Sequence, residues 1–384
     1  MAAVGLHAAE EAEVVTDEDT DGANARPFAA SETVTERTLV KPFEWLEERT
    51  KFELGMSLDT LFLASIGGGD IEPAASLDAT FQFERPIFGT WLENHLTLYA
   101  RMRVRTALLD DAPADLSDDI GTIWGVVDGF SDSGFEIPDL FFRHVMPDRN
   151  LEFRYGQMVI DAQLDGRPTG GAKTAFLNRA FSASPGAAFP RSGAGATIAW
   201  DPDGPWDVVY AITTVQGSQE SDQVDFQFGS SDYFQAFQVG YNFPGKDRGP
   251  RRAQLMLWHS DAAPDSGLDP GEGLSFTYSH RFNEPIRAAF CRVAFASGEA
   301  SAASFMLVGG VTADCPDDSV AGVGLGLGRS SLNNDWNGVA EAFYRKPLGQ
   351  YGSVKLNGQL IVGQGFVDSG SVRLLLGASA RCTF

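Results

Sequence analysis

Three arginines spaced two residues apart, Arg101, Arg103 and Arg105, form the pattern in this chain that most suggests binding chemistry. A spacing of two places side chains on one face of a β-strand. Each guanidinium carries a planar fork of N–H donors that can bind two neighbouring hydroxyl groups, and carboxylates can accept hydrogen bonds from the same hydroxyls. The pattern therefore predicts a hydrogen-bonding surface for polar solutes.

The chain from Lys51 onward alternates between apolar and polar residues, as half-buried strands do. Leu96, Leu98 and Met102, for example, alternate with the three arginines. Sixteen strands are predicted, the first three near 52–59, 76–84 and 92–105. The others are predicted near 139–146, 151–159, 194–201, 206–215, 233–243, 252–260, 272–282, 286–297, 303–312, 319–329, 335–346, 352–363 and 371–384. We therefore predict an all-β chain that forms a transmembrane antiparallel β-barrel.

Three properties favour the membrane barrel over a soluble β-sandwich. The strands are long, about 9–14 residues, which suits a tilted membrane strand. Charges such as Arg103 and Glu152 stand at strand centres, where a hydrated lumen would accept them. Short turns alternate with longer connections (109–138, 160–193, 216–232), as in bacterial outer-membrane barrels. This topology places both termini in the periplasm and outer-membrane lipid against the apolar face.

Composition excludes other classes of protein. Lys and Arg number 29 and Asp and Glu number 52, so the formal charge is −23. Phosphate contacts need a basic surface, and the sequence has none, so nucleic acid is not an expected partner. Since no stretch approaches about 18 consecutive apolar residues, a helical membrane protein is excluded.

The N-terminal region differs from the rest of the chain. Residues 1–42 are acidic and aperiodic, which predicts a disordered segment, and residues 1–9 resemble the remnant of a signal peptide. A short helix is predicted at 43–50, and the barrel at 51–384. The three cysteines are too scattered for a zinc site, although a Cys291–Cys315 bridge stays open. No cofactor or metal is expected.

Several segments, in order along the chain, resemble those of the carbohydrate-selective porins of the OprB type. The resemblance covers most of the chain from about Trp45 to Phe384, and the collinear order of the segments carries it. The segments are WLEERT (45–50), LEFRYGQMVIDAQLDG (151–166), FLNRAF (176–181), SPGAAFPRSGAGATIAWDP (184–202), WDVVYAITTVQG (206–217), FQVGYNF (237–243), GEGLSFTYSHRF (271–282), GVGLGLGRSS (322–331), AEAFYRKPLG (340–349) and RLLLGASARCTF (373–384).

The resemblance implies passive diffusion of small carbohydrates through a narrow, water-filled channel, without catalysis. Selectivity then requires a constriction, because sixteen strands enclose a wide lumen. We expect loop 160–193 to fold into the pore and to contribute Lys173, Asn178 and Arg179. The residues predicted to face it and bind sugar are Arg101, Arg103, Arg105, Arg143, Glu152 and Arg154, with Tyr99 and Trp258 stacking on a pyranose.

Three alternatives remain beside this interpretation. A general or ion-selective porin would share the fold, and a soluble β-rich binding protein would share the alternation. An outer-membrane enzyme is disfavoured, because the histidines lie on different strands and no nucleophile elbow accompanies them. The sequence does not decide between a homo-oligomer and a monomer, nor which sugar or ion would pass.

Overall fold

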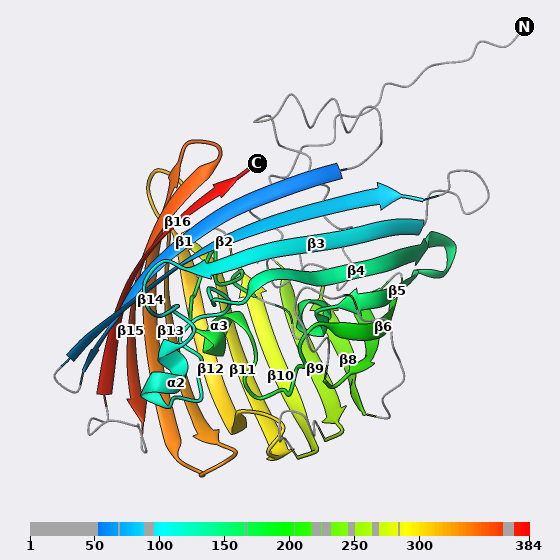
Figure 1. Ribbon diagram of the computed structural model, residues 1–384. Coiled ribbons are helices and arrows are strands. Elements are labelled where there is room, and N and C mark those ends of the chain that lie inside the picture. The colour runs from blue at the N-terminus through cyan, green and yellow to red at the C-terminus, as the bar shows by residue number, and fades with distance from the viewer. Residues whose placement is uncertain are drawn as a thin grey trace, which may run out of the picture.

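The computed structural model describes residues 53–384, except 68–69, 88–95, 165, 167, 203, 217–223, 225–231, 245–249, 263–268, 283–284 and 364–371. The described residues form sixteen antiparallel strands in one closed barrel (Figure 1). Each strand pairs with its neighbours in sequence, and β1 (Glu53–Gly67) pairs with β16 (Val372–Thr383) to close the ring. The predicted fold class and strand number are confirmed. The predicted acidic segment 1–42 and helix 43–50 lie outside the described residues.

The strand boundaries agree best with prediction in the second half of the chain, where 233–243 and 352–363 are reproduced. β4 begins five residues before its predicted start, because the strand continues through Pro138 with a register shift opposite Arg101 and Arg103. The remaining strands are β2 (Asp70–Pro86), β3 (Leu96–Ala107), β4 (Gly134–Met146), β5 (Leu151–Met158), β6 (Gly193–Trp200), β7 (Trp206–Thr214), β8 (Tyr233–Phe243), β9 (Arg251–Ser260), β10 (Gly271–Arg281), β11 (Ile286–Gly298), β12 (Ala303–Asp314), β13 (Val320–Ser330), β14 (Trp336–Leu348) and β15 (Gly352–Gly363).

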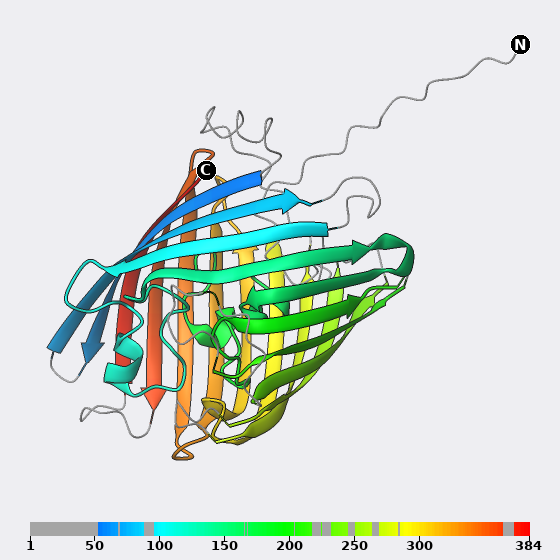
Figure 2. The same cartoon turned by 45° about the vertical axis from the view of Figure 1, so that its right-hand side comes forward.

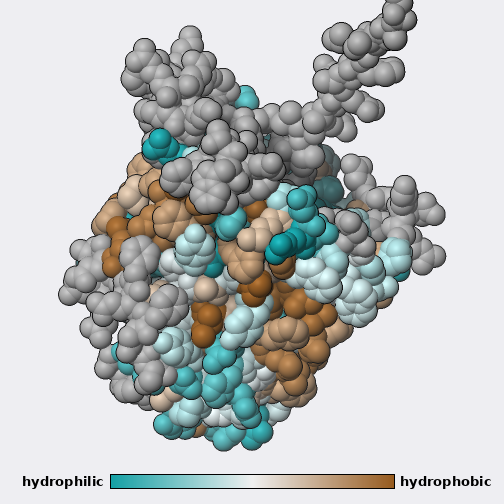
Figure 3. All heavy atoms as spheres, turned by 90° about the vertical axis from the view of Figure 1, so that its right-hand side faces the viewer, coloured by the Kyte–Doolittle hydropathy of each residue, from teal (hydrophilic) through white to brown (hydrophobic). Residues whose placement is uncertain are grey.

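The two faces of the sheet have the polarity that a membrane barrel requires. Outward side chains such as Leu255, Leu257 and Phe276 are exposed, whereas inward Gln254 and Thr277 are buried. This reverses the usual order in soluble proteins and matches a wall with lipid outside. Figure 3 shows apolar side chains on the outer wall, with hydrophilic ones gathered at the lower rim. No helix in the described residues is long and apolar enough to cross a membrane.

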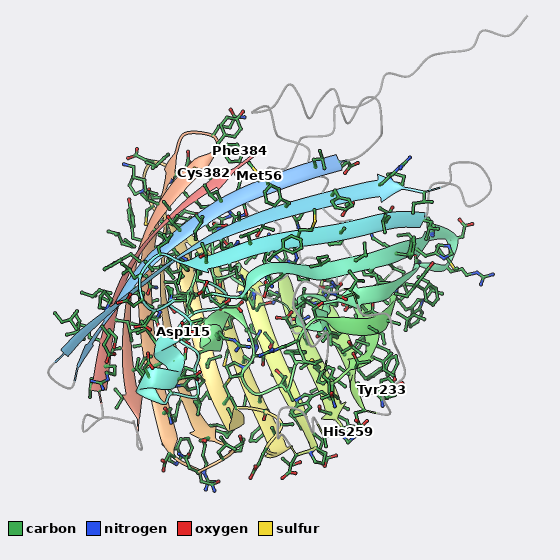
Figure 4. All side chains as sticks on the ribbon, in the orientation of Figure 1. Met56, Asp115, Tyr233, His259, Cys382 and Phe384 are labelled. Carbon is green, nitrogen blue, oxygen red and sulfur yellow. The ribbon has the colours of Figure 1, made fainter. Side chains whose placement is uncertain are left out.

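The C-terminus completes the barrel seam. The backbone N–H of Phe384 donates to the carbonyl of Met56 at 2.8 Å, and the N–H of Met56 donates back to Phe384 at 3.1 Å. Figure 4 shows Met56, Cys382 and Phe384 together at one end of the barrel, with Tyr233 and His259 at the other. The last residue of the chain is therefore part of the strand pairing.

Helical structure in the described residues is confined to short turns in connections. α2 (Leu116–Ile120) lies between β3 and β4, and α3 (Arg179–Ser182) lies between β5 and β6. Two 3₁₀ turns, η1 (Pro147–Arg149) and η2 (Ile160–Gln163), flank β5. In the views of Figures 1 and 2, α3 lies inside the ring of strands, so its connection enters the lumen.

Candidate functional site

Loop 160–193 folds into the barrel and is fixed to the inner face of β14 and β15. The backbone N–H groups of Leu177 and Asn178 donate to the carboxylate of Glu341 at 2.6 and 2.9 Å. Lys355 Nζ donates to the carbonyls of Ala172 and Ala175, the latter at 2.7 Å. These anchors satisfy loop backbone groups that would otherwise be buried without partners.

Asn178, expected to meet solutes, holds the loop instead. Its side-chain oxygen accepts from the N–H of Ala180 at 2.9 Å and so caps α3. Its amide nitrogen donates to Gln359 on β15, also at 2.9 Å. Because the residue is fully buried, it is a positioning residue for the loop.

The connection between β3 and β4 is joined to loop 160–193 by backbone hydrogen bonds. The N–H of Asp128 donates to Leu177, and that of Arg179 donates to Gly125, both at 3.0 Å. Gln359 Nε2 donates to the carbonyl of Val126 at 2.9 Å. The two connections, which we call the inner loops (residues 108–133 and 159–192), therefore dock on this wall as one unit.

An apolar cluster lies between the inner loops and the wall. Trp124, Phe176 and Phe181 are buried here, and the Phe176 ring meets Phe343 edge-on at 5.0 Å. Glycines on β13 leave room for them. A Cβ at Gly324 would lie 2.8 Å from the Phe181 ring, and one at Gly328 would lie 2.6 Å from Trp124. This side of the lumen, the inner face of β12–β15, is the covered wall.

The inner face of β1–β5, which we call the charged wall, carries a row of paired charges. Arg101 lies 2.5 Å from Asp139, and Arg103 lies 2.8 Å from Glu136. Arg105 donates to Asp78 at 3.1 Å. The three arginines thus share one face of β3, as their spacing predicts, and each has a carboxylate on a neighbouring strand.

The row continues onto β4 and β5 around Glu152. Arg143 forms a bidentate pair with this carboxylate, at 2.9 and 3.1 Å, and Arg154 donates to it at 2.7 Å. Arg154 also contacts Gln163 of the inner loops. Arg143, Glu152 and Arg154, all singled out from the sequence, are therefore brought together.

Lys173 joins the inner loops to the charged wall. Its Nζ lies 2.8 Å from Asp59 on β1 and 3.2 Å from Asp78 on β2. Both carboxylates are buried. Lys173 therefore compensates two buried charges that a low-dielectric wall would otherwise disfavour.

The two aromatic residues predicted to stack on solute are occupied by the protein. Tyr99 accepts a hydrogen bond from Gln82 at 2.8 Å and stacks on Phe141, with ring centroids 4.8 Å apart. Trp258 is 3 % exposed in a second apolar cluster with Phe234, so its ring presents no open face to the lumen. Alternation predicted its inward direction but could not show that inner-loop residues cover it.

Arg179 is the predicted loop residue whose side chain is exposed. Its neighbours Asn178, Ala180 and Phe181 are buried toward the wall. Within the described residues, its guanidinium has no hydrogen bond or ion pair. It therefore lies on the face of α3 that points away from the wall, toward the lumen.

Apart from Glu152, the carboxylates of the site were not singled out from the sequence, and neither were the anchors of the inner loops. Asp59 and Asp78 stand on predicted polar faces, but an isolated acidic residue on a strand does not reveal its partner. Glu136 precedes the predicted start of β4, and Asp139 stands at that start. Glu341, Lys355 and Gln359 are inward positions whose partners are loop backbone groups, which no side-chain pattern can show.

Two further observations concern the acidic, histidine and cysteine side chains of the described residues. No group of three or more His, Cys, Asp or Glu side chains there could hold a metal ion. The three cysteines are free, with Cys291 and Cys382 exposed, so Cys291 and Cys315 are not bridged in this structure.

Comparison with known proteins places the fold among outer-membrane porins. No model of a known family and no curated protein matches the chain. Among solved structures, OprB of Pseudomonas putida at high pH matches with a TM-score of 0.72 and 12 % identity, covering 89 % of this chain and 97 % of that one. The anion-selective porin of Comamonas acidovorans (0.52, 10 % identity, 87 % and 99 %) and OmpF of Salmonella typhi (0.56, 10 %, 87 % and 97 %) match as well. The chain has a porin fold.

Proposed function

We propose that this chain is a carbohydrate-selective porin of the OprB type in a bacterial outer membrane, with both termini in the periplasm. Small sugars would diffuse passively through its lumen past an Arg/Glu-lined constriction, and no bond would be made or broken. The observation that carries the proposal is the row of paired guanidinium and carboxylate groups on the charged wall. The likeness in fold to OprB supports it.

The arrangement suits hydroxyl-rich solutes for a physical reason. A sugar entering a narrow passage exchanges hydrogen bonds with water for hydrogen bonds with the wall. Arg103 and Arg105 supply N–H donors, and Glu136 and Glu152 supply acceptors, held in place by their mutual ion pairs. Because both kinds of group are already fixed, the sugar bears little of the cost of ordering them. Binding stays weak enough for the sugar to leave.

The inner loops contribute by narrowing the passage. They occupy the covered wall, so solutes would pass between them and β2–β5. Lys173 and Arg179 would then line the constriction from the loop side, whereas Asn178 would act through the loop's position. Tyr99 and Trp258 would support the lumen wall by packing against other protein side chains, without contacting the solute.

A planar-bilayer recording of the purified, detergent-solubilised protein tests the proposal. We expect step-like conductance that falls as glucose or maltose is added, and Arg103→Ala should weaken sugar binding about tenfold, the effect of losing one charge-assisted hydrogen bond. Conductance that ignores sugars but follows the salt gradient would favour a general or ion-selective porin. Absence of conductance would overturn the proposal that this protein forms a channel.

A further inference from the structure

The ion pairs of the charged wall have a common orientation, with the carboxylate nearer the wall and the base nearer the lumen. The Lys173 side chain is 22 % exposed, against 2 % for its partner Asp59. Arg101 is likewise 22 % exposed, against 5 % for Asp139. Glu136 is the carboxylate of this row that is as exposed as a base it faces, Arg105. A solute beside this wall therefore meets N–H donors before it meets carboxylates.

This orientation is not a simple consequence of the longer basic side chains. In the pair Lys346–Asp317, at one end of β14, the carboxylate is more exposed than the ammonium group. The more exposed partner is thus the carboxylate in this pair and the base in most pairs of the charged wall. The net charge of −23 consequently does not describe the surface that a solute meets in the lumen.

Arg179 adds an unpaired donor group near the same row. A Cβ at Gly125 would lie 2.7 Å from the Arg179 side chain, and one at Gly129 would lie 3.1 Å from an Arg105 nitrogen. Both arginines therefore pack against one short stretch of the inner loops, 125–129, which spans at most about 14 Å even if fully extended. Two arginine side chains, one paired and one without a partner among the described residues, thus lie against the same short stretch of the inner loops.

We propose that the lumen contains a binding site for sugars that carry a carboxylate, formed by Arg179 together with Arg105 and its neighbours on β3. This inference rests on the proposed function and narrows its substrate class. A planar guanidinium fork matches the two oxygens of a carboxylate better than it matches a lone hydroxyl. Asp128, in the stretch 125–129, has an interaction of its own. The Arg179 guanidinium has no hydrogen bond or ion pair among the described residues, so its donors are available to a solute.

The acidic residues of the inner loops do not prevent this selectivity. Five aspartates lie between residues 110 and 119, on and beside α2. At about 0.15 M salt the Debye length is about 8 Å, so exposed charges act mainly on their immediate surroundings. Their repulsion would lower the rate of entry more than the affinity inside.

The test compares two sugars that differ only at C6, D-galacturonate and D-galactose, by current block in planar bilayers at about 0.15 M salt. We expect galacturonate to bind about tenfold tighter than galactose, and Arg179→Gln to reduce this preference to about twofold. The matched control is Arg329→Gln, which removes the same charge from an exposed position at the outer end of β13. It should leave both affinities unchanged.

The outcomes distinguish this inference from the proposed function. Equal block by both sugars, or a preference that survives Arg179→Gln, would overturn the carboxylate site while leaving a carbohydrate channel in place. A current block by galactose alone would likewise overturn the carboxylate site and leave the carbohydrate channel in place. If neither sugar reduced the current of an open channel, the proposed function itself would fail.

Discussion

The inner faces of β3 and β13 lie on different sides of the lumen and serve different purposes. At positions 101–105 of β3 every second residue is an arginine, whereas at positions 322–328 of β13 every second residue is a glycine. The arginines reach toward the lumen and pair with carboxylates on β2 and β4. At Gly324 and Gly328 aromatic side chains of the inner loops occupy the space that a side chain would take, and at Gly322 the Phe343 ring of β14 does so. The same alternation of residues thus builds the charged wall and the covered wall of one barrel.

In the proposed porin, this contrast between the two walls would let a wide barrel have a narrow passage. Loops without regular structure cannot hold a fixed position in water unless their backbone groups and apolar side chains find partners. Here Glu341 and Lys355 supply the polar partners and Phe343 supplies an apolar one. In the proposed function, the inner loops held on the covered wall narrow the solute path along the charged wall.

The largest effect should come from filling the space that Gly324 leaves. In Gly324→Val the new Cβ would lie about 2.8 Å from the Phe181 ring, so the inner loops must move. We expect single-channel conductance to rise about twofold or more and sugar block to be lost, as measured in planar bilayers.

Gly358→Val is the matched control, because the nearest atom to its new Cβ is a Leu376 side-chain carbon at 3.7 Å. Its conductance should equal that of the unmodified protein. If Gly324→Val behaved like Gly358→Val, the inner loops would not be seated on β13.

A smaller effect is expected from removing the polar anchor on β14. Glu341→Ala leaves the N–H groups of Leu177 and Asn178 without their acceptor, which costs about 1–3 kcal/mol per buried unsatisfied donor. The inner loops should then fluctuate, seen as increased open-channel current noise at unchanged mean barrel stability. Glu341→Gln keeps one of the two acceptor oxygens, so it should restore part of the quiet current. Noise equal to that of Glu341→Ala would contradict the anchoring role.

The smallest effect is expected from Lys173, which joins the inner loops to the charged wall. Lys173→Met removes the ammonium group that lies near Asp59 and Asp78, leaving Arg105 and Arg381 as their nearest bases. The constriction should become more favourable to cations, which a reversal potential in a KCl gradient would report as a shift toward the potassium equilibrium potential. A shift toward chloride would show that Lys173 does not face the ion path.

The sequence predicted the basic side chains of the charged wall, but it did not predict the contacts that cover the other side of the lumen. On β3, β5 and β16 one face is polar. The alternation of apolar and polar residues therefore predicted both the strand and the direction in which its side chains point. On β1, Leu61 and Leu63 face inward and Phe62 faces outward, so the alternation disappears where the inner loops cover the wall. Glycines on β13 carry no side chain whose partner could be predicted. Trp258 showed the same difficulty, since its cover comes from distant residues.

The central claim, that solutes pass along the charged wall and not along the covered wall, can be tested by cysteine accessibility. Single cysteines would be introduced in a background in which Cys291, Cys315 and Cys382 are replaced by serine. Arg103→Cys lies on the charged wall. Val339→Cys replaces a residue of the covered wall that is 4 % exposed beneath the inner loops. A charged, water-soluble thiol reagent should modify Arg103→Cys quickly and reduce the current, while leaving Val339→Cys unmodified. Equal modification rates at the two positions would contradict the account.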